Sequence, residues 1–153
     1  MRTNIDDYED AVSIVNALSR LSNRYKLYPQ DSIHRELALA FGIRTINQFN
    51  PKDPTEFDTW LQAKSLSGLR YYFEPCINNR IDFDGVSSSN PLDNHVIDFV
   101  VIVVFDRNLV PDMVLQIPWK ILPTLMEWDP DTERWCAKLT DELKSRSKIL
   151  YEL

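Results

Sequence analysis

One apolar segment, residues 97–105 (IDFVVIVVF), constrains the fold of this chain more than any other. Its run of valine, isoleucine and phenylalanine is rich in β-branched side chains, which favour a strand. The run has no polar alternation, and this is typical of a strand buried on both faces of a sheet. We therefore expect residues 97–105 to form a strand inside the sheet and not at its edge.

The segment that follows predicts the neighbour of this strand. Residues 107–111 (RNLVP) form a short turn, and residues 112–117 (DMVLQI) again have the composition of a strand. Parallel strands need a crossover connection of a dozen or more residues, so a turn this short suits only a reversal. Residues 97–105 and 112–117 are therefore predicted to pair antiparallel.

Three segments are predicted to be helices packed on this sheet: residues 7–26, 32–41 and 140–151. The first carries apolar side chains at helical spacing and runs from an acidic start to a basic end, which suits the helix dipole. Those apolar residues are Ala11, Ile14, Val15, Leu18, Leu21 and Tyr25. Gly42 lies just past the second segment, where a glycine commonly ends a helix. Thr140 is a suitable N-cap for the third.

The composition predicts a single soluble domain over residues 1–153. The longest apolar run is far shorter than the about 20 residues of a membrane helix, and no secretory leader is recognisable. Cys76 and Cys136 have no metal-ligand spacing, which predicts two free thiols in a reducing cytoplasm.

The formal net charge of −6 disfavours strong nonspecific DNA binding. An acidic chain is better suited to a basic protein surface, as a protein that imitates DNA would be.

The stretch from residue 54 to 66 has two alternatives. A helix is favoured by local signals, because Asp53 can serve as N-cap, Pro54 suits the first helical position and Glu56 completes a capping box. The other alternative is a hairpin with a strand near 57–64 and a turn at Ser67 and Gly68. Its second strand would cover residues 69–74 and stop at Pro75. The sequence leaves this choice open.

Shorter elements complete the expected topology. Residues 79–85 (NRIDFDG) and 134–139 (RWCAKL) are predicted strands, and residues 119–126 (WKILPTLM) a short helix interrupted at Pro123. The strip from Trp119 to Trp128 places two tryptophans around apolar residues. It is either core cover or a protein-binding edge.

Four stretches together resemble the PD-(D/E)xK superfamily, which has the restriction-endonuclease-like fold. They are RELALAFGI, FDTWLQAKSLSGLRYYFEP, IDFVVIVVFDRNLVPDMVLQIP and CAKLTDEL. The resemblance is to small bacterial and phage-associated members of the superfamily. It implies an α/β fold in which helices flank a central mixed sheet.

The resemblance also implies a set of site residues. Members with intact sites use an Asp on one strand, a Glu/Gln-x-Lys on the next and often a Glu from the preceding helix. Here Asp58, Glu74 and Glu36 match the metal ligands, and Lys64 is the candidate catalytic lysine. In such sites carboxylates bind Mg²⁺ or Mn²⁺, which activates a water molecule that the lysine orients.

The Glu/Gln-x-Lys motif has two placements in this sequence, and neither is intact. Gln62-Ala63-Lys64 has the right residue types, but six residues along a straight strand place Lys64 roughly 20 Å from Asp58. The hairpin alternative sets Glu74 opposite the strand of Asp58 and puts Cys76 at the lysine position. If the register slips by two residues, Glu74 itself takes that position.

Two functions therefore compete. The first is a nuclease-fold protein of bacterial or phage defence or counter-defence, with a degenerate metal site, that binds a partner as an inhibitor or accessory factor. The second is a small Mg²⁺-dependent DNA endonuclease or restriction component. The corresponding partners are a protein or a nucleic acid, a homodimer is compatible with either function, and no membrane is expected. The first function requires no cofactor, whereas the second requires Mg²⁺ or Mn²⁺.

Overall fold

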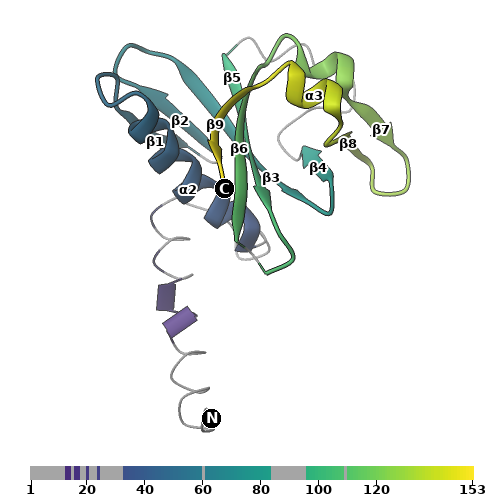
Figure 1. The fold of residues 1–153 in the computed structure, drawn as a ribbon, viewed down its shortest axis with the longest axis horizontal. Helices are drawn as coiled ribbons and strands as arrows, with labels where there is room; N and C mark the ends of the chain where they lie inside the picture. Colours follow the sequence, from purple (N-terminus) through teal and green to yellow (C-terminus); the bar gives the residue numbers. More distant parts are fainter. Residues whose placement is uncertain are drawn as a thin grey trace, which may run out of the picture.

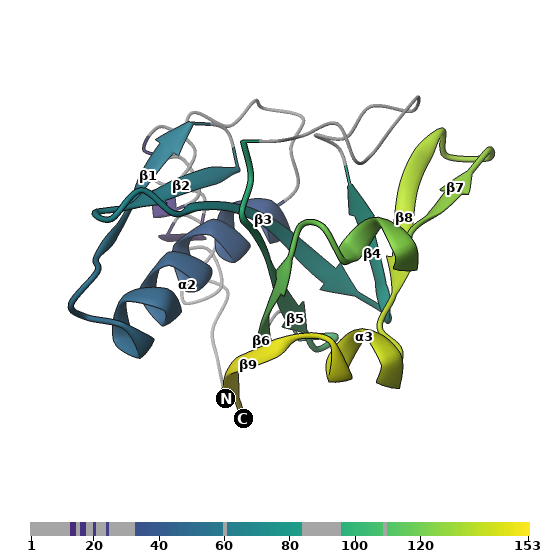
Figure 2. The same ribbon diagram turned by 90° about the horizontal axis from the view of Figure 1, so that it is seen from above.

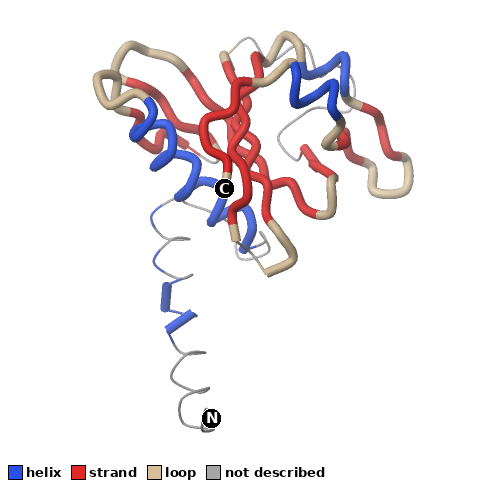
Figure 3. Tube along the Cα trace, viewed as in Figure 1, coloured by secondary structure: helices blue, strands red, loops and turns tan. Residues whose placement is uncertain are grey.

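The computed structural model describes residues 13, 14, 16, 17, 20, 24, 33–59, 61–83, 96–108 and 110–153. These residues form an α/β structure in which nine strands make one mixed sheet (Figure 1). Strands are the most abundant regular element of the described chain, as Figure 3 shows by colour. The predicted helix at residues 7–26 lies outside the described residues, except for six scattered positions that are helical.

Two α-helices and one 3₁₀ turn accompany the strands of the described chain. The helical elements are α2 (Ile33–Phe49), η1 (Leu122–Leu125) and α3 (Asp141–Ser145). The strands are β1 (Thr55–Thr59), β2 (Gln62–Ser65), β3 (Arg70–Ile77), β4 (Arg80–Phe83), β5 (Phe99–Phe105), β6 (Pro111–Pro118), β7 (Glu127–Asp129), β8 (Arg134–Lys138) and β9 (Lys148–Glu152). Figures 1 and 2 show α2 and α3 on opposite sides of β3, β5 and β6.

The predicted central strand is confirmed, but it begins at Phe99 and not at Ile97. The main path of the sheet is β7-β8-β4-β3-β5-β6-β9, so β5 has a neighbour on each side. It pairs parallel with β3 and antiparallel with β6. Val100, Val101, Ile102 and Val103 are completely buried. The unbroken β-branched run therefore occupies the middle of the core, as its composition predicted.

The second helix is longer than predicted, and the prediction that Gly42 ends it is wrong. Helix α2 continues through Gly42 to Phe49. A Cβ atom at position 42 would lie 2.6 Å from the ring of Phe73 on β3. Glycine is therefore required here by the close approach of helix and strand and not by a turn.

Replacing Gly42 by alanine is predicted to destabilise the protein. Alanine gains about 1 kcal/mol over glycine inside a helix, but overpacking a core costs about 1–3 kcal/mol. Phe73 is completely buried and has no solvent to move into, so we expect the steric cost to exceed the helical gain. Urea denaturation of Gly42→Ala would show a lower unfolding free energy, and the double variant with Phe73→Leu would recover part of it. An unchanged or higher stability of Gly42→Ala would contradict the close approach.

The last helix was also predicted wrongly. Instead of one helix over 140–151, α3 ends at Ser145 and Lys148–Glu152 forms strand β9 on the edge of β6. The Ser147 hydroxyl donates to the Leu143 carbonyl at 2.7 Å and satisfies one of the free carbonyls at the helix end. Pairing with β6 then satisfies the backbone of the following residues. Thr140 does cap α3, as predicted, because its side chain accepts a hydrogen bond from the Leu143 amide.

The prediction that the second arm of the hairpin stops at Pro75 is wrong, because strand β3 runs to Ile77. The Phe73 amide donates toward Leu61 beside β2, at 2.8 Å. Amides two residues apart on a strand point the same way, so position 75 faces the side of β2 and β4. The described pairs with β2 end at Tyr72, and those with β4 begin at Cys76. The missing N–H of Pro75 therefore falls between two ladders and removes no bond from either.

Residues 54–66 form strands and not a helix. Asp53, the expected N-cap, instead accepts hydrogen bonds from the amide and hydroxyl of Ser67, at 2.7 and 2.6 Å. The predicted turn at Ser67 and Gly68 is confirmed, and Gly68 has a φ of +102° that favours glycine. The first arm contains a further reversal at Leu61, so that β1 pairs with β2 and only β2 pairs with β3.

The shorter elements largely follow the predictions. Strands β4 and β8 lie in the two predicted segments. The turn η1 has Pro123 in its first turn, where proline is tolerated, so this residue does not interrupt it. Within the described residues, we find no helix with the length and apolarity needed to cross a membrane.

Candidate functional site

Two candidate site residues, Lys64 and Glu74, occupy strand positions that alternate with those facing α2, whereas Glu36 lies on α2 itself. Phe73 and Val101 are next to Gly42, so their side chains face α2. Side chains alternate along a strand and cross-strand partners share a face. The other face carries Gln62 and Lys64 of β2, Arg70, Tyr72 and Glu74 of β3, and the buried Val100 and Ile102 of β5.

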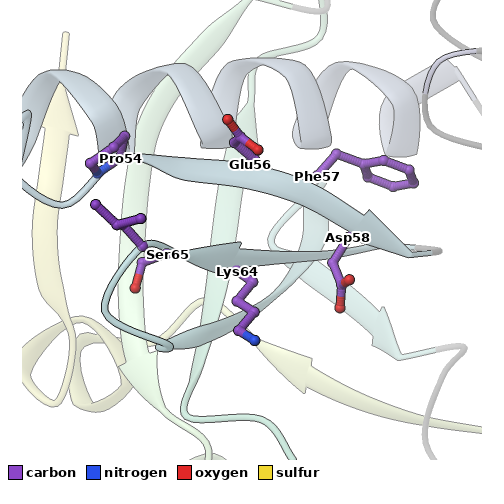
Figure 4. A pocket seen from close by; sticks show the side chains of 7 residues that line it. Pro54, Glu56, Phe57, Asp58, Lys64 and Ser65 are labelled. Atoms are coloured by element: carbon purple, nitrogen blue, oxygen red, sulfur yellow. The ribbon is translucent and has the colours of Figure 1, made fainter.

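Asp58 and Lys64 line one open pocket of about 330 Å³ at the β1–β2 ribbon. Figure 4 shows their charged ends directed to the same side of the ribbon. The Asp58 carboxylate accepts a hydrogen bond from Nη1 of Arg70 at 2.8 Å. Lys64 is the cross-strand neighbour of both Glu56 and Arg70. The pocket is thus a surface array of opposite charges, which water and salt screen.

Glu74, in contrast, is completely buried. Its Oε1 accepts a hydrogen bond from the Tyr72 hydroxyl at 2.9 Å. Nε of Arg35 on α2 lies 3.8 Å from the same oxygen. Burying a carboxyl group is costly unless it has hydrogen-bond donors and a counter-charge. Tyr72 supplies one donor and Arg35 a nearby counter-charge, and the contact with Arg35 joins β3 to α2.

The predicted ligands do not fit a shared Mg²⁺ or Mn²⁺ site. Strand β2 lies between the strands of Asp58 and Glu74, which the predicted hairpin had placed side by side. Each of these carboxylates instead has an arginine as neighbour. The third predicted ligand, Glu36, is buried in the first turn of α2. In the part of the chain that the structure describes, no three His, Cys, Asp or Glu side chains are grouped so that they could hold a metal ion.

Cys76 stands two residues after Glu74, where an intact motif would have its lysine. The side chain is completely buried. Burial raises the pKa of the thiol to about 12, and the nearby Lys144 of α3 opposes this only in part. A neutral thiol supplies no positive charge to a phosphate and cannot replace the lysine.

Sequence reasoning missed the three residues that contact the predicted acids, two arginines and one tyrosine. Arg70 and Tyr72 alternate with Glu74 along β3, so period-two spacing alone would have placed all three on one face. Arg35 carried no comparable signal, because its contact with Glu74 depends on how α2 is placed against the sheet. Comparison of the sequence with protein-family models and with curated proteins gives no match.

Replacing Tyr72 by phenylalanine is predicted to lower the unfolding free energy by about 1–3 kcal/mol, because a buried acceptor loses a donor. Urea denaturation would measure the change. Tyr71→Phe is the matched control, since Tyr71 lies next to it on the other face of β3 and its ring stacks on Phe99. Equal stability of Tyr72→Phe and the wild type would contradict the role of this hydroxyl.

Cys76 is predicted to be unreactive toward alkylation in the folded protein. A thiol that is buried and has a pKa raised to about 12 forms almost no thiolate at neutral pH, and the thiolate is the nucleophile. Mass spectrometry of Cys136→Ser after treatment with iodoacetamide should show labelling only in denaturant. Rapid stoichiometric labelling of the native variant would mean that Cys76 is an accessible thiolate.

Proposed function

We propose that this chain is a noncatalytic protein with a restriction-endonuclease-like scaffold and that it acts by binding a basic protein partner. Its role is that of an inhibitor or accessory factor in bacterial or phage defence or counter-defence, the setting that the family resemblance suggests. The observation that carries the proposal is the state of the candidate site. Glu74 and Cys76 are buried, and Asp58 has Arg70 as its partner.

Electrostatics supports the absence of turnover. Attack on a phosphodiester brings an anionic nucleophile to an anionic centre, so a nuclease must supply positive charge from a metal and usually from a lysine. Here the acids that would hold the metal are separated by β2, and the residue at the lysine position is a neutral thiol. The scaffold is retained while the groups needed for cleavage serve the fold.

The β7–β8 hairpin supports a basic partner. Residues 127–135 (EWDPDTERW) contain four acids and one base, so their net charge of −3 is half of the −6 of the whole chain. The two predicted tryptophans differ, because Trp119 is core whereas Trp128 on β7 is 39% exposed. The Trp128 ring lies edge-on to Trp135, with 5.6 Å between centroids. Tryptophans held in this way are common anchors of protein interfaces and bind arginine through cation–π contacts.

The four acids of this hairpin differ in their freedom to meet a partner. Asp129 accepts a hydrogen bond from Nη2 of Arg80 at 2.6 Å, and this bond lowers the pKa of the Asp129 carboxyl. Glu127, Asp131 and Glu133 are exposed. The exposed acids are therefore the ones we assign to partner recognition, while Asp129 fixes the hairpin to β4.

Binding of an arginine-rich peptide tests the partner chemistry. Calorimetric titration of the wild type should give an affinity that falls as salt rises, because surface charge attraction is screened. A variant with Glu127→Gln, Asp131→Asn and Glu133→Gln should bind much more weakly. Asp141→Asn with Glu142→Gln, two acids on α3, is the control that should leave binding almost unchanged. Equal affinity of the hairpin variant and the wild type would remove the hairpin from the proposal.

Cleavage assays test the noncatalytic assignment. Pure protein incubated with supercoiled, linear and single-stranded DNA in Mg²⁺ and in Mn²⁺ is expected to leave all three substrates intact. One observation favours the alternative, a small endonuclease: Asp58, Glu56 and Lys64 line the same pocket. Cleavage that disappears in both Asp58→Ala and Lys64→Ala would establish that alternative and overturn the noncatalytic one.

A further inference from the structure

Helix α2 has a fully buried apolar stripe on the sheet and, beside it, a second stripe that is half-buried and packs only in part against the core. The first stripe includes Ala38, Leu39 and Ile46, which are buried. The second lines a surface groove of about 320 Å³ together with the ends of β5 and β6. The residues of this outer groove are Leu37, Ala40, Phe41, Arg44, Phe105 and Pro111. The α2 members have i, i+3, i+4 and i+7 spacing, which is the spacing that receives another helix.

The N-terminal segment of the same chain carries a complementary stripe. Ala11, Ile14, Val15 and Leu18 also follow i, i+3, i+4 and i+7 spacing. The described positions of this segment are helical, and Ile14 is 55% exposed. An amphipathic helix gains most of its stability by burying such a face. Ile14, the member of this stripe that the structure describes, is therefore not covered in a single copy.

The charges of the two surfaces are also complementary. The N-terminal segment begins with Asp6, Asp7, Glu9 and Asp10. The outer groove has one charged residue, Arg44, which is exposed on α2. An acidic helix start next to an arginine is favourable, and it makes one end of the apolar contact selective.

We propose that the N-terminal segment, residues 6–26, docks in the outer groove of a second copy of this chain. Two copies exchange their segments about a twofold axis, so each groove is filled and each apolar stripe is covered. The same patch is used on both copies, as twofold symmetry requires. The occupant is the chain itself because the complementary stripe and the complementary charge occur together in its own sequence. This inference is independent of whether the chain binds a basic protein or cleaves DNA.

The test is the mass of the particle in solution, measured by light scattering after gel filtration at micromolar concentration. The wild type is expected to have twice the chain mass of 17.9 kDa. Ala40→Glu closes the groove, and Ile14→Glu places a charge in the segment, so each variant alone should be monomeric. Leu66→Glu is the matched control, because Leu66 is exposed at the tip of the β2–β3 turn and should leave the dimer intact.

Mixing the two monomeric variants distinguishes exchange from other arrangements. The intact segment of Ala40→Glu can dock in the intact groove of Ile14→Glu, so the mixture should form a heterodimer through one of the two junctions. A monomeric wild type, variants that remain dimeric or a mixture without heterodimer would each overturn the proposal. A mixture without heterodimer would mean that each N-terminal segment docks in the groove of its own chain. If Ala40→Glu does not fold, Arg44→Glu at the exposed groove end should weaken dimerisation about tenfold or more.

Discussion

The placement of α2 against the sheet depends on the close approach of Gly42 to Phe73. Because position 42 has no side chain, α2 rests directly on the centre of β3 and, through Val101, on β5. The same helix then holds β1, since the Asn47 side chain accepts from the Thr55 amide at 2.6 Å and donates to its carbonyl at 3.0 Å. This close approach therefore sets which side chains of β3 and β5 face α2. By strand alternation, Tyr72 and Glu74 lie on the other face, together with the buried Val100 and Ile102.

The candidate metal ligands are held apart by the local course of the chain. The reversal at Leu61, which has a φ of +55°, inserts β2 between the strands of Asp58 and Glu74. The two acids then meet different environments, because Asp58 lies at the surface beside Arg70 and Glu74 lies in the core beside Tyr72. An arginine near each acid compensates its charge locally. The charge that these acids would offer to a metal is thus already engaged by an arginine.

The sequence predicted the parts of the fold that depend on local composition. The β-branched run of β5, the short turn to β6 and the cap at Thr140 follow from adjacent residues alone. The errors arose where a distant contact reversed a local rule. Gly42 resembles a helix end but accommodates Phe73, and Pro75 resembles a strand end but falls between two ladders. At the candidate site, the pattern identified Asp58 and Glu74 as candidates, but the strand that separates them depends on a positive φ at a leucine, which composition does not reveal.

The geometry of the sheet also relates the two proposed surfaces to each other. The outer groove belongs to α2, next to the ends of β5 and β6, whereas the β7–β8 hairpin forms the opposite end of the main strand path. A second copy docked in the groove would therefore leave both hairpins exposed. Two acidic hairpins on one twofold particle can engage two basic sites at once, and the second contact then forms at a high effective concentration. Exchange of the N-terminal segments would thus strengthen the binding of a dimeric or repetitive basic partner without any new contact in the hairpin.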